Sequence, residues 1–82
     1  MSIRVVDNEA TSFNIRRILE ERNITPKMVQ KTLKLNSVQA VYKWINPKNK
    51  AIPSLDNLVQ LANYLNCGIE EILVMKEIDV ED

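Results

Sequence analysis

The chain has 82 residues, of which 45% are hydrophobic and 27% are charged, so it is long enough for one folded domain and too short for two. It has no histidine and one cysteine, Cys67, which excludes histidine-based zinc sites, histidine general bases and an internal disulfide. No apolar run approaches the roughly 18 residues of a membrane helix. We therefore expect a cytoplasmic protein that is not an enzyme, makes no membrane contact and uses no metal, cofactor or small-molecule ligand.

Positive and negative charges are equal in number but are separated along the chain. Residues 1–53 contain ten of the eleven Lys and Arg residues and four acidic residues, a net charge of +6. Residues 54–82 contain one Lys and seven acidic residues, a net charge of −6. A neutral total alone counts against a polyanionic partner, because surfaces that bind phosphates are basic. The separation instead indicates one anion-binding face and one acidic face.

The chain begins with an arm over residues 1–7, in which Ile3–Val6 is the only stretch that has the pattern of a strand. Asp7 can cap a first helix over residues 8–22. Apolar positions recur in this helix at steps of three and four residues, which predicts one buried face. That face consists of Ala10, Phe13, Ile15, Ile18 and Leu19, and ends at Arg22.

Thr25 and Pro26 form a strong start signal for a second helix. The threonine hydroxyl can accept a hydrogen bond from a backbone N–H, and proline fits the first helical position. This helix is predicted to run from Pro26 to about Leu33. Its inward residues are predicted to be Met28, Val29, Thr32 and Leu33, and its outward residues Lys27, Lys31 and Lys34.

A third short helix is predicted over residues 38–45, after a turn at Lys34–Asn36. Ser37 is its cap. Val38, Val41 and Trp44 or Ile45 fall on one face, and Gln39, Tyr42 and Lys43 fall on the other. Residues 46–53 are predicted to form a polar loop, because Pro47 and Pro53 both discourage a helix. Lys48 and Lys50 project from this loop.

The last third of the chain is predicted to hold the central core helix. Ser54 caps a helix that ends near Asn66. Its broad apolar stripe consists of Leu55, Leu58, Val59, Leu61, Ala62 and Leu65. Gly68 ends this pattern, and Ile69, Ile72 and Leu73 predict one or two turns of a fifth helix. Residues 76–82 are predicted to be a frayed acidic tail.

Four segments in this order resemble the phage-repressor type of helix-turn-helix domain, also called the Cro-type or xenobiotic-response-element family. They are Ile15–Thr25, Ala40–Trp44, Ile52–Ala62 and Leu65–Leu73. The resemblance spans residues 8–75 and implies a compact all-α, five-helix fold like that of lambda repressor. It divides the chain into an arm (1–7), a DNA-binding domain (8–75) and an acidic tail (76–82).

The chain departs from the family pattern around the second and third helices. Gln30 stands where the family usually has a small residue, and Lys34–Asn36 stand where it has a glycine. The turn before Ser37 is one residue longer. Pro26 replaces a glutamine that touches phosphate in many members, and Pro47 replaces a glycine in a loop about two residues longer than usual.

The resemblance implies a DNA site in which the recognition helix, residues 38–45, enters the major groove. Gln39 can pair with adenine N6 and N7, and Lys43 can reach guanine O6 or N7 or a phosphate. Val38 and Tyr42 can contact a thymine methyl group. The residues expected to hold phosphates are Lys27, Lys31, Ser37, Lys48, Asn49 and Lys50.

Other interpretations remain open beside this one. Gln39 can be a solvated polar residue, and each lysine can simply be exposed to water. Trp44 and Cys67 are interpreted as packing residues and not as a base-stacking aromatic and a redox switch. We expect a bacterial or phage transcriptional regulator, a repressor that binds a palindrome as a homodimer through its fifth helix and nearby surfaces. The alternative is a protein-interaction module, an adaptor or antitoxin that uses the same fold.

Overall fold

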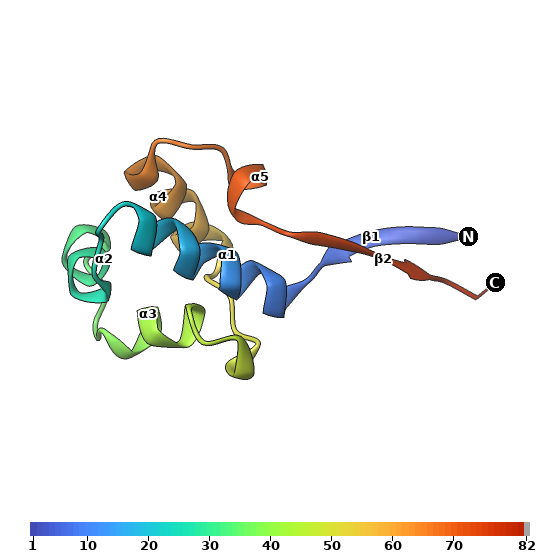
Figure 1. Cartoon of the computed structure of the whole chain (residues 1–82), viewed down its shortest axis with the longest axis horizontal. Helices are drawn as coiled ribbons and strands as arrows, with labels where there is room; N and C mark the ends of the chain where they lie inside the picture. Colours follow the sequence, from blue (N-terminus) through green and yellow to red (C-terminus); the bar gives the residue numbers. More distant parts are fainter. Residues whose placement is uncertain (82) are drawn as a thin grey trace.

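Helices occupy one end of the molecule and a two-stranded ribbon projects from it (Figure 1). The computed structural model describes residues 1–81 and measures 46 × 24 × 22 Å. The helical end, which we call the head, contains α1 (Asn8–Glu21), α2 (Pro26–Leu33), α3 (Gln39–Trp44), the 3₁₀ helix η1 (Pro47–Asn49), α4 (Leu55–Leu65) and α5 (Ile69–Ile72). The ribbon pairs β1 (Ser2–Val6) with β2 (Met75–Asp79).

Three of the predicted helix caps are confirmed. The Asp7 carboxylate accepts a hydrogen bond from the Ala10 N–H at 3.0 Å. The Thr25 hydroxyl accepts from the Met28 N–H at 3.2 Å, with Pro26 in the first turn of α2. The Ser54 hydroxyl accepts from the Asn57 N–H at 3.3 Å. Each cap satisfies a backbone donor that the first helical turn leaves without a partner, so these residues fix where the helices begin.

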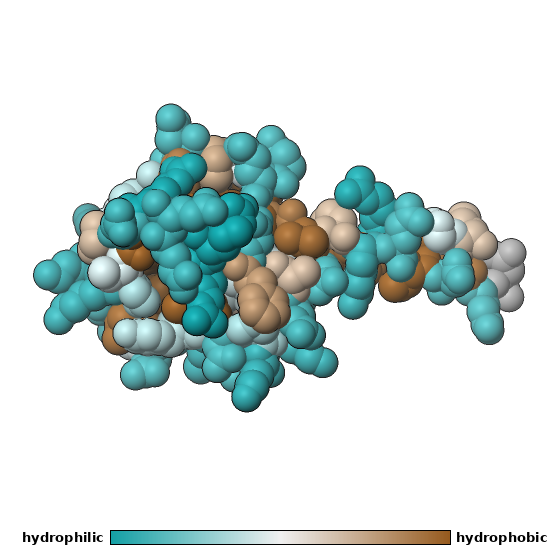
Figure 2. Space-filling view, viewed as in Figure 1, coloured by the Kyte–Doolittle hydropathy of each residue, from teal (hydrophilic) through white to brown (hydrophobic). Residues whose placement is uncertain are grey.

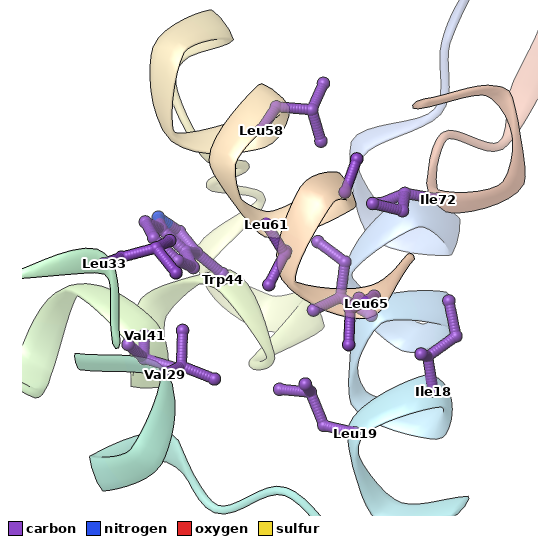
Figure 3. Packing of buried hydrophobic residues seen from close by; sticks show 12 residues of the cluster. Ile18, Leu19, Val29, Leu33, Val41, Trp44, Leu58, Leu61, Leu65 and Ile72 are labelled. Atoms are coloured by element: carbon purple, nitrogen blue, oxygen red, sulfur yellow. The ribbon is translucent and has the colours of Figure 1, made fainter. Parts of the chain in front are cut away.

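The core lies where α4 meets the other helices, as Figure 3 shows. Leu61 on α4 is fully buried, as are Val29 on α2 and Val41 on α3. Trp44 is 5% exposed, which confirms its interpretation as a packing residue. The buried hydrophobic residues are Ile15, Ile18, Leu19, Val29, Leu33, Val41, Trp44, Leu58, Leu61, Ala62, Leu65 and Ile72.

Several residues predicted to face the core are on the surface instead. Leu55 is 74% exposed and Phe13 is 54% exposed. The others are Met28, Thr32 and Val59. Phe13 lies on the side of α1 opposite the buried Ile15, and the stripes predicted from periodicity were wider than the faces that other helices cover.

Thr11 and Ser12 are fully buried although they are polar. The Val74 N–H donates to the Thr11 hydroxyl at 3.0 Å, and that hydroxyl donates to the Val74 carbonyl at 3.4 Å. The Ser12 hydroxyl donates to the Ala51 carbonyl at 3.2 Å. The first turns of α1 therefore pack against backbone from two distant segments, which requires hydrogen-bonding side chains in place of apolar ones.

The two chain ends pair as an antiparallel ribbon, which corrects two predictions. The all-α class is overstated, because β1 and β2 form a two-stranded sheet in which Ile3 lies opposite Ile78. The tail is not frayed over Met75–Asp79; of the predicted tail, only Asp82 lies outside the described residues. An acidic tail has no strand signal of its own, and this one becomes a strand because the β-branched residues of β1 supply a partner.

Candidate nucleic-acid interface

The turn between α2 and α3 is closed by Gln30 and Lys34. Lys34 adopts the left-handed conformation, with φ 56° and ψ 44°. The Leu35 N–H donates to the Gln30 carbonyl at 3.0 Å, and the Gln30 side-chain amide donates back to the Leu35 carbonyl at 3.4 Å. Gln30, one of the departures from the family pattern, thus fastens the longer turn to the end of α2.

Ser37 lies just before the recognition helix and bonds its first residue. Its hydroxyl oxygen accepts a hydrogen bond from the Gln39 N–H at 2.9 Å. The prediction that Ser37 caps this helix is wrong, because Val38 occupies the N-cap position and no side chain caps the helix; α3 covers Gln39–Trp44 and is shorter than the predicted 38–45. Because the Ser37 hydroxyl accepts the backbone bond through oxygen, its own O–H remains able to donate to a phosphate.

One face of α3 is packed and the other is open. Val41 is fully buried and Trp44 is nearly so, which anchors the helix against the core (Figure 3). Gln39, Tyr42 and Lys43 are exposed, and Tyr42 has 51% of its surface accessible. Val38 is half-buried. The structure therefore places three of the four predicted base-contacting residues on one exposed surface and the fourth at its border.

A shallow hollow runs along α3. Ser37, Gln39 and Lys43 line it together, so the structure brings a predicted phosphate-contacting residue beside two predicted base-contacting ones. Asn36 lines the same hollow, and sequence reasoning missed it because a turn asparagine is usually explained by backbone geometry. A donor and acceptor amide at this position can reach either a base edge or a phosphate.

The basic loop is more ordered than predicted. Pro47 begins the 3₁₀ helix η1, because proline suits a first helical position, and the Asn46 side chain accepts from the Lys48 N–H at 3.1 Å. Lys50 ends η1 in the left-handed conformation at φ 51°. The Asn8 side-chain amide donates to the Lys50 carbonyl at 3.1 Å, so the loop is fastened to the start of α1.

Two residues of α1 join the basic loop, and sequence reasoning missed both. Phe13 and Arg16 line one hollow with Lys48 and Lys50. The Arg16 guanidinium lies 3.0 Å from the Glu20 carboxylate, and both side chains are more than half exposed, so this ion pair holds Arg16 only weakly. Residues 13 and 16 are three positions apart and therefore share one face of α1. This signal is hidden in the sequence because the apolar Phe13 is predicted to face the core.

The remaining predicted phosphate contacts lie apart from these groups. Lys27 and Lys31 are exposed on α2 and line neither of the two hollows. Asn49 is exposed within η1. The exposed lysines of the predicted site therefore lie on α2, on α3, and in η1 and its C-terminal cap. Arg16 places one more exposed cation on α1.

Chemistry other than binding has few groups to support it within residues 1–81. Cys67 is half-buried and packs against the core, and burial, followed by the nearby Glu71 carboxylate, raises the pKa of its thiol. A less acidic thiol is a weaker nucleophile at neutral pH. Across residues 1–81, His, Cys, Asp and Glu side chains form no group of three able to hold a metal ion. None of the described helices is both long enough and apolar enough to span a bilayer.

Comparison with known proteins identifies the fold family. No curated protein and no solved structure gives a significant match to the chain. A family model for the Cro/C1-type helix-turn-helix DNA-binding domain matches residues 14–77, which confirms the resemblance inferred from the sequence and is most of the chain. With its five α-helices and a recognition helix whose polar face is open, the chain belongs to the Cro/C1-type helix-turn-helix DNA-binding domain family.

Proposed function

We propose that the chain is a transcriptional repressor that binds a specific double-stranded DNA sequence by placing α3 in the major groove. The observation that carries the proposal is the exposed surface of Gln39, Tyr42 and Lys43, backed by the buried Val41 and Trp44. A helix held rigidly from behind can present side chains to base edges at a fixed depth and angle.

The chemistry of these side chains matches base edges. The amide of Gln39 pairs in two-pronged fashion with adenine N6 and N7, and the ammonium of Lys43, one turn on, reaches guanine O6 or N7. Tyr42 and the half-buried Val38 contact a thymine methyl group. Gln39 lies at the N-terminal end of α3, the end that helix-turn-helix proteins direct toward the bases.

Phosphate contacts set the register of the head on the duplex without reading sequence. We assign these contacts to cations and polar groups that flank α3 on both sides: Lys27, Lys31, Ser37, Lys48, Asn49 and Lys50. Arg16 joins them because it lines the same hollow as Lys48 and Lys50. These residues account for a basic surface on a chain whose net charge is zero.

Repression follows from occupancy, since a bound dimer blocks access to its site. A homodimer on a palindrome doubles the number of base contacts, and a small domain of this kind gains specificity from two half-sites.

Selection of bound duplexes from a random pool tests the function. We expect enrichment of a palindromic motif and an affinity that falls steeply between about 50 and 200 mM salt, because bound cations release counterions from DNA. Dissociation constants weaker than about 10 µM at low salt for every duplex would contradict the proposal. That result would favour the protein-interaction module. In the same selection, the variant Gln39→Ala should give a motif with a weaker preference at one base position.

A further inference from the structure

Phe13 is an aromatic side chain on the surface of α1, with 54% of its area accessible. Figure 2 shows that hydrophilic residues cover most of this side of the head and that apolar residues are exposed only between them. A ring that stays in contact with water contributes little to folding. Single exposed apolar residues are common, so the surroundings of Phe13 decide whether its exposure serves binding.

The hollow around Phe13 is basic. Arg16, Lys48 and Lys50 line it together with the ring, and Glu9 contributes one negative charge against their three positive charges. All four charged residues are exposed. A ligand for this hollow must therefore carry anionic groups for the cations and, next to them, an apolar surface for the ring.

Hydrogen bonds fix the two walls of the hollow relative to each other. The Asn8 side-chain amide donates to the Lys50 carbonyl at 3.1 Å, and the Ser12 hydroxyl donates to the Ala51 carbonyl at 3.2 Å. Ser12 is fully buried, so its bond is shielded from water. The end of the basic loop is thus held against α1 before a ligand binds, which lowers the entropy lost on binding.

The backbone of DNA has the chemistry that this hollow requires. Along each strand an anionic phosphate alternates with a deoxyribose, whose carbon atoms form an apolar edge. The hollow also lies close to the recognition helix, because η1 begins at Pro47, three residues after α3 ends at Trp44. The six residues of α3 span about 9 Å and the major groove is about 12 Å wide, so a strand that borders the groove passes beside the helix.

We propose that Phe13 contacts DNA by packing its ring against a backbone deoxyribose, while Arg16, Lys48 and Lys50 hold the phosphates on either side. This inference rests on the proposed function, which assigns the cations and leaves Phe13 without a role. The contact removes the ring and the sugar carbons from water, and it adds affinity without adding charge. Because every nucleotide has a deoxyribose, Phe13 reads no base.

Fluorescence titration of labelled duplexes with the full chain tests the contact. Phe13→Ala should weaken binding about 5- to 20-fold, because one covered face of the ring corresponds to roughly 40–70 Å² of apolar area. The loss should be the same on the selected duplex and on a duplex of random sequence. Leu55→Ala is the matched control, because Leu55 is 74% exposed on α4 and lines no part of the hollow, so this variant should bind as the parent does.

The salt dependence separates the ring from its cationic neighbours. In Phe13→Ala the slope of log affinity against log salt should equal that of the parent, because no charge is lost. Lys48→Ala should reduce the same slope by about 1. A general loss of folded protein would lower the amplitude of the titration and leave the affinity of the remaining folded chain unchanged.

A tryptophan in place of the ring reports whether DNA covers it. The emission maximum of Phe13→Trp should move to shorter wavelength as duplex is added, and the shift should saturate with the binding curve. Trp44 is 5% exposed and already shielded, so it contributes little to the change. Leu55→Trp places a second tryptophan on an exposed site of α4 and should give no shift.

The outcomes separate this inference from the proposed function. Parent affinity in Phe13→Ala, or unmoved emission of Phe13→Trp at saturating duplex, would overturn the inference and leave the proposed function intact. If the chain selects no motif but binds every duplex with the described dependence on Phe13, the inference stands and the proposed function fails. A Phe13 effect confined to single strands would show stacking on an unpaired base and overturn the sugar contact. Absence of binding to any duplex would overturn both.

Discussion

The head and the ribbon are stabilised by different interactions. In the head, twelve hydrophobic side chains form one buried cluster around α4 (Figure 3). In the ribbon, every residue of β2 is exposed, and the strands are held mainly by pairing with each other. Two links join the ribbon to α1: the Asp7 N–H donates to the Val74 carbonyl at 2.8 Å, and Thr11 bonds the same residue. The head therefore contains the buried core, whereas the ribbon has no buried core of its own.

The largest expected effect comes from the core. Leu61→Ala should lower the free energy of unfolding by about 2–5 kcal/mol, because Leu61 is fully buried and its removal leaves a cavity. Urea denaturation followed by circular dichroism measures the loss. Leu55→Ala is the control on the same helix, and its 74% exposure predicts a change within about 0.5 kcal/mol. Equal losses in the two variants would show that α4 does not organise the core.

The link between head and ribbon can be cut at Thr11. Thr11→Val removes a buried hydroxyl that bonds both the N–H and the carbonyl of Val74, and it should cost about 1–3 kcal/mol by leaving the Val74 N–H without a partner, whereas the carbonyl keeps its bond from the Asp7 N–H. Hydrogen exchange should accelerate at Val74 and over β2. Ser12→Ala is the matched control, because its bond goes to Ala51, so exchange should rise in the basic loop instead. Unchanged exchange over β2 would mean that the ribbon does not depend on this link.

The head alone should carry DNA recognition. Gln39→Ala should relax the preference at one base position by about 1–3 kcal/mol, because the two-pronged contact to adenine is lost. Lys50→Ala should leave the preference intact, weaken binding to all duplexes alike and reduce the salt slope by about 1. Fluorescence titration of the selected duplex and of single-base variants measures both effects. Full specificity in Gln39→Ala would remove that residue from the base-reading surface.

The same contrast explains what could be predicted from the sequence. The bounds of α2 and α4, the caps at Asp7, Thr25 and Ser54, and the burial of Trp44 follow from local patterns, and the structure has them as predicted. The ribbon pairs residues 69 to 77 positions apart, and no local pattern in an acidic tail indicates that pairing.

The candidate site divides in the same way. The outward face of α3 could be predicted from periodicity, because Val41 and Trp44 mark the inward one. Phe13 and Arg16 could not be placed beside Lys48 and Lys50, because that contact depends on the fastening of the Lys50 carbonyl by Asn8. A hydrogen bond between residues 42 positions apart leaves no signature in a single sequence.

The smallest expected effect concerns Lys34, in the turn between α2 and α3. Lys34→Gly should raise the free energy of unfolding by about 0.5 kcal/mol, because relief of a left-handed strain of about 1–2 kcal/mol exceeds the added entropy of the unfolded chain. The urea midpoint should rise while the slope of the transition stays constant. Lys31→Gly, inside α2, is the control and should lose about 1 kcal/mol. A lower midpoint in Lys34→Gly would mean that the Lys34 side chain stabilises the turn by contacts that outweigh its strained backbone.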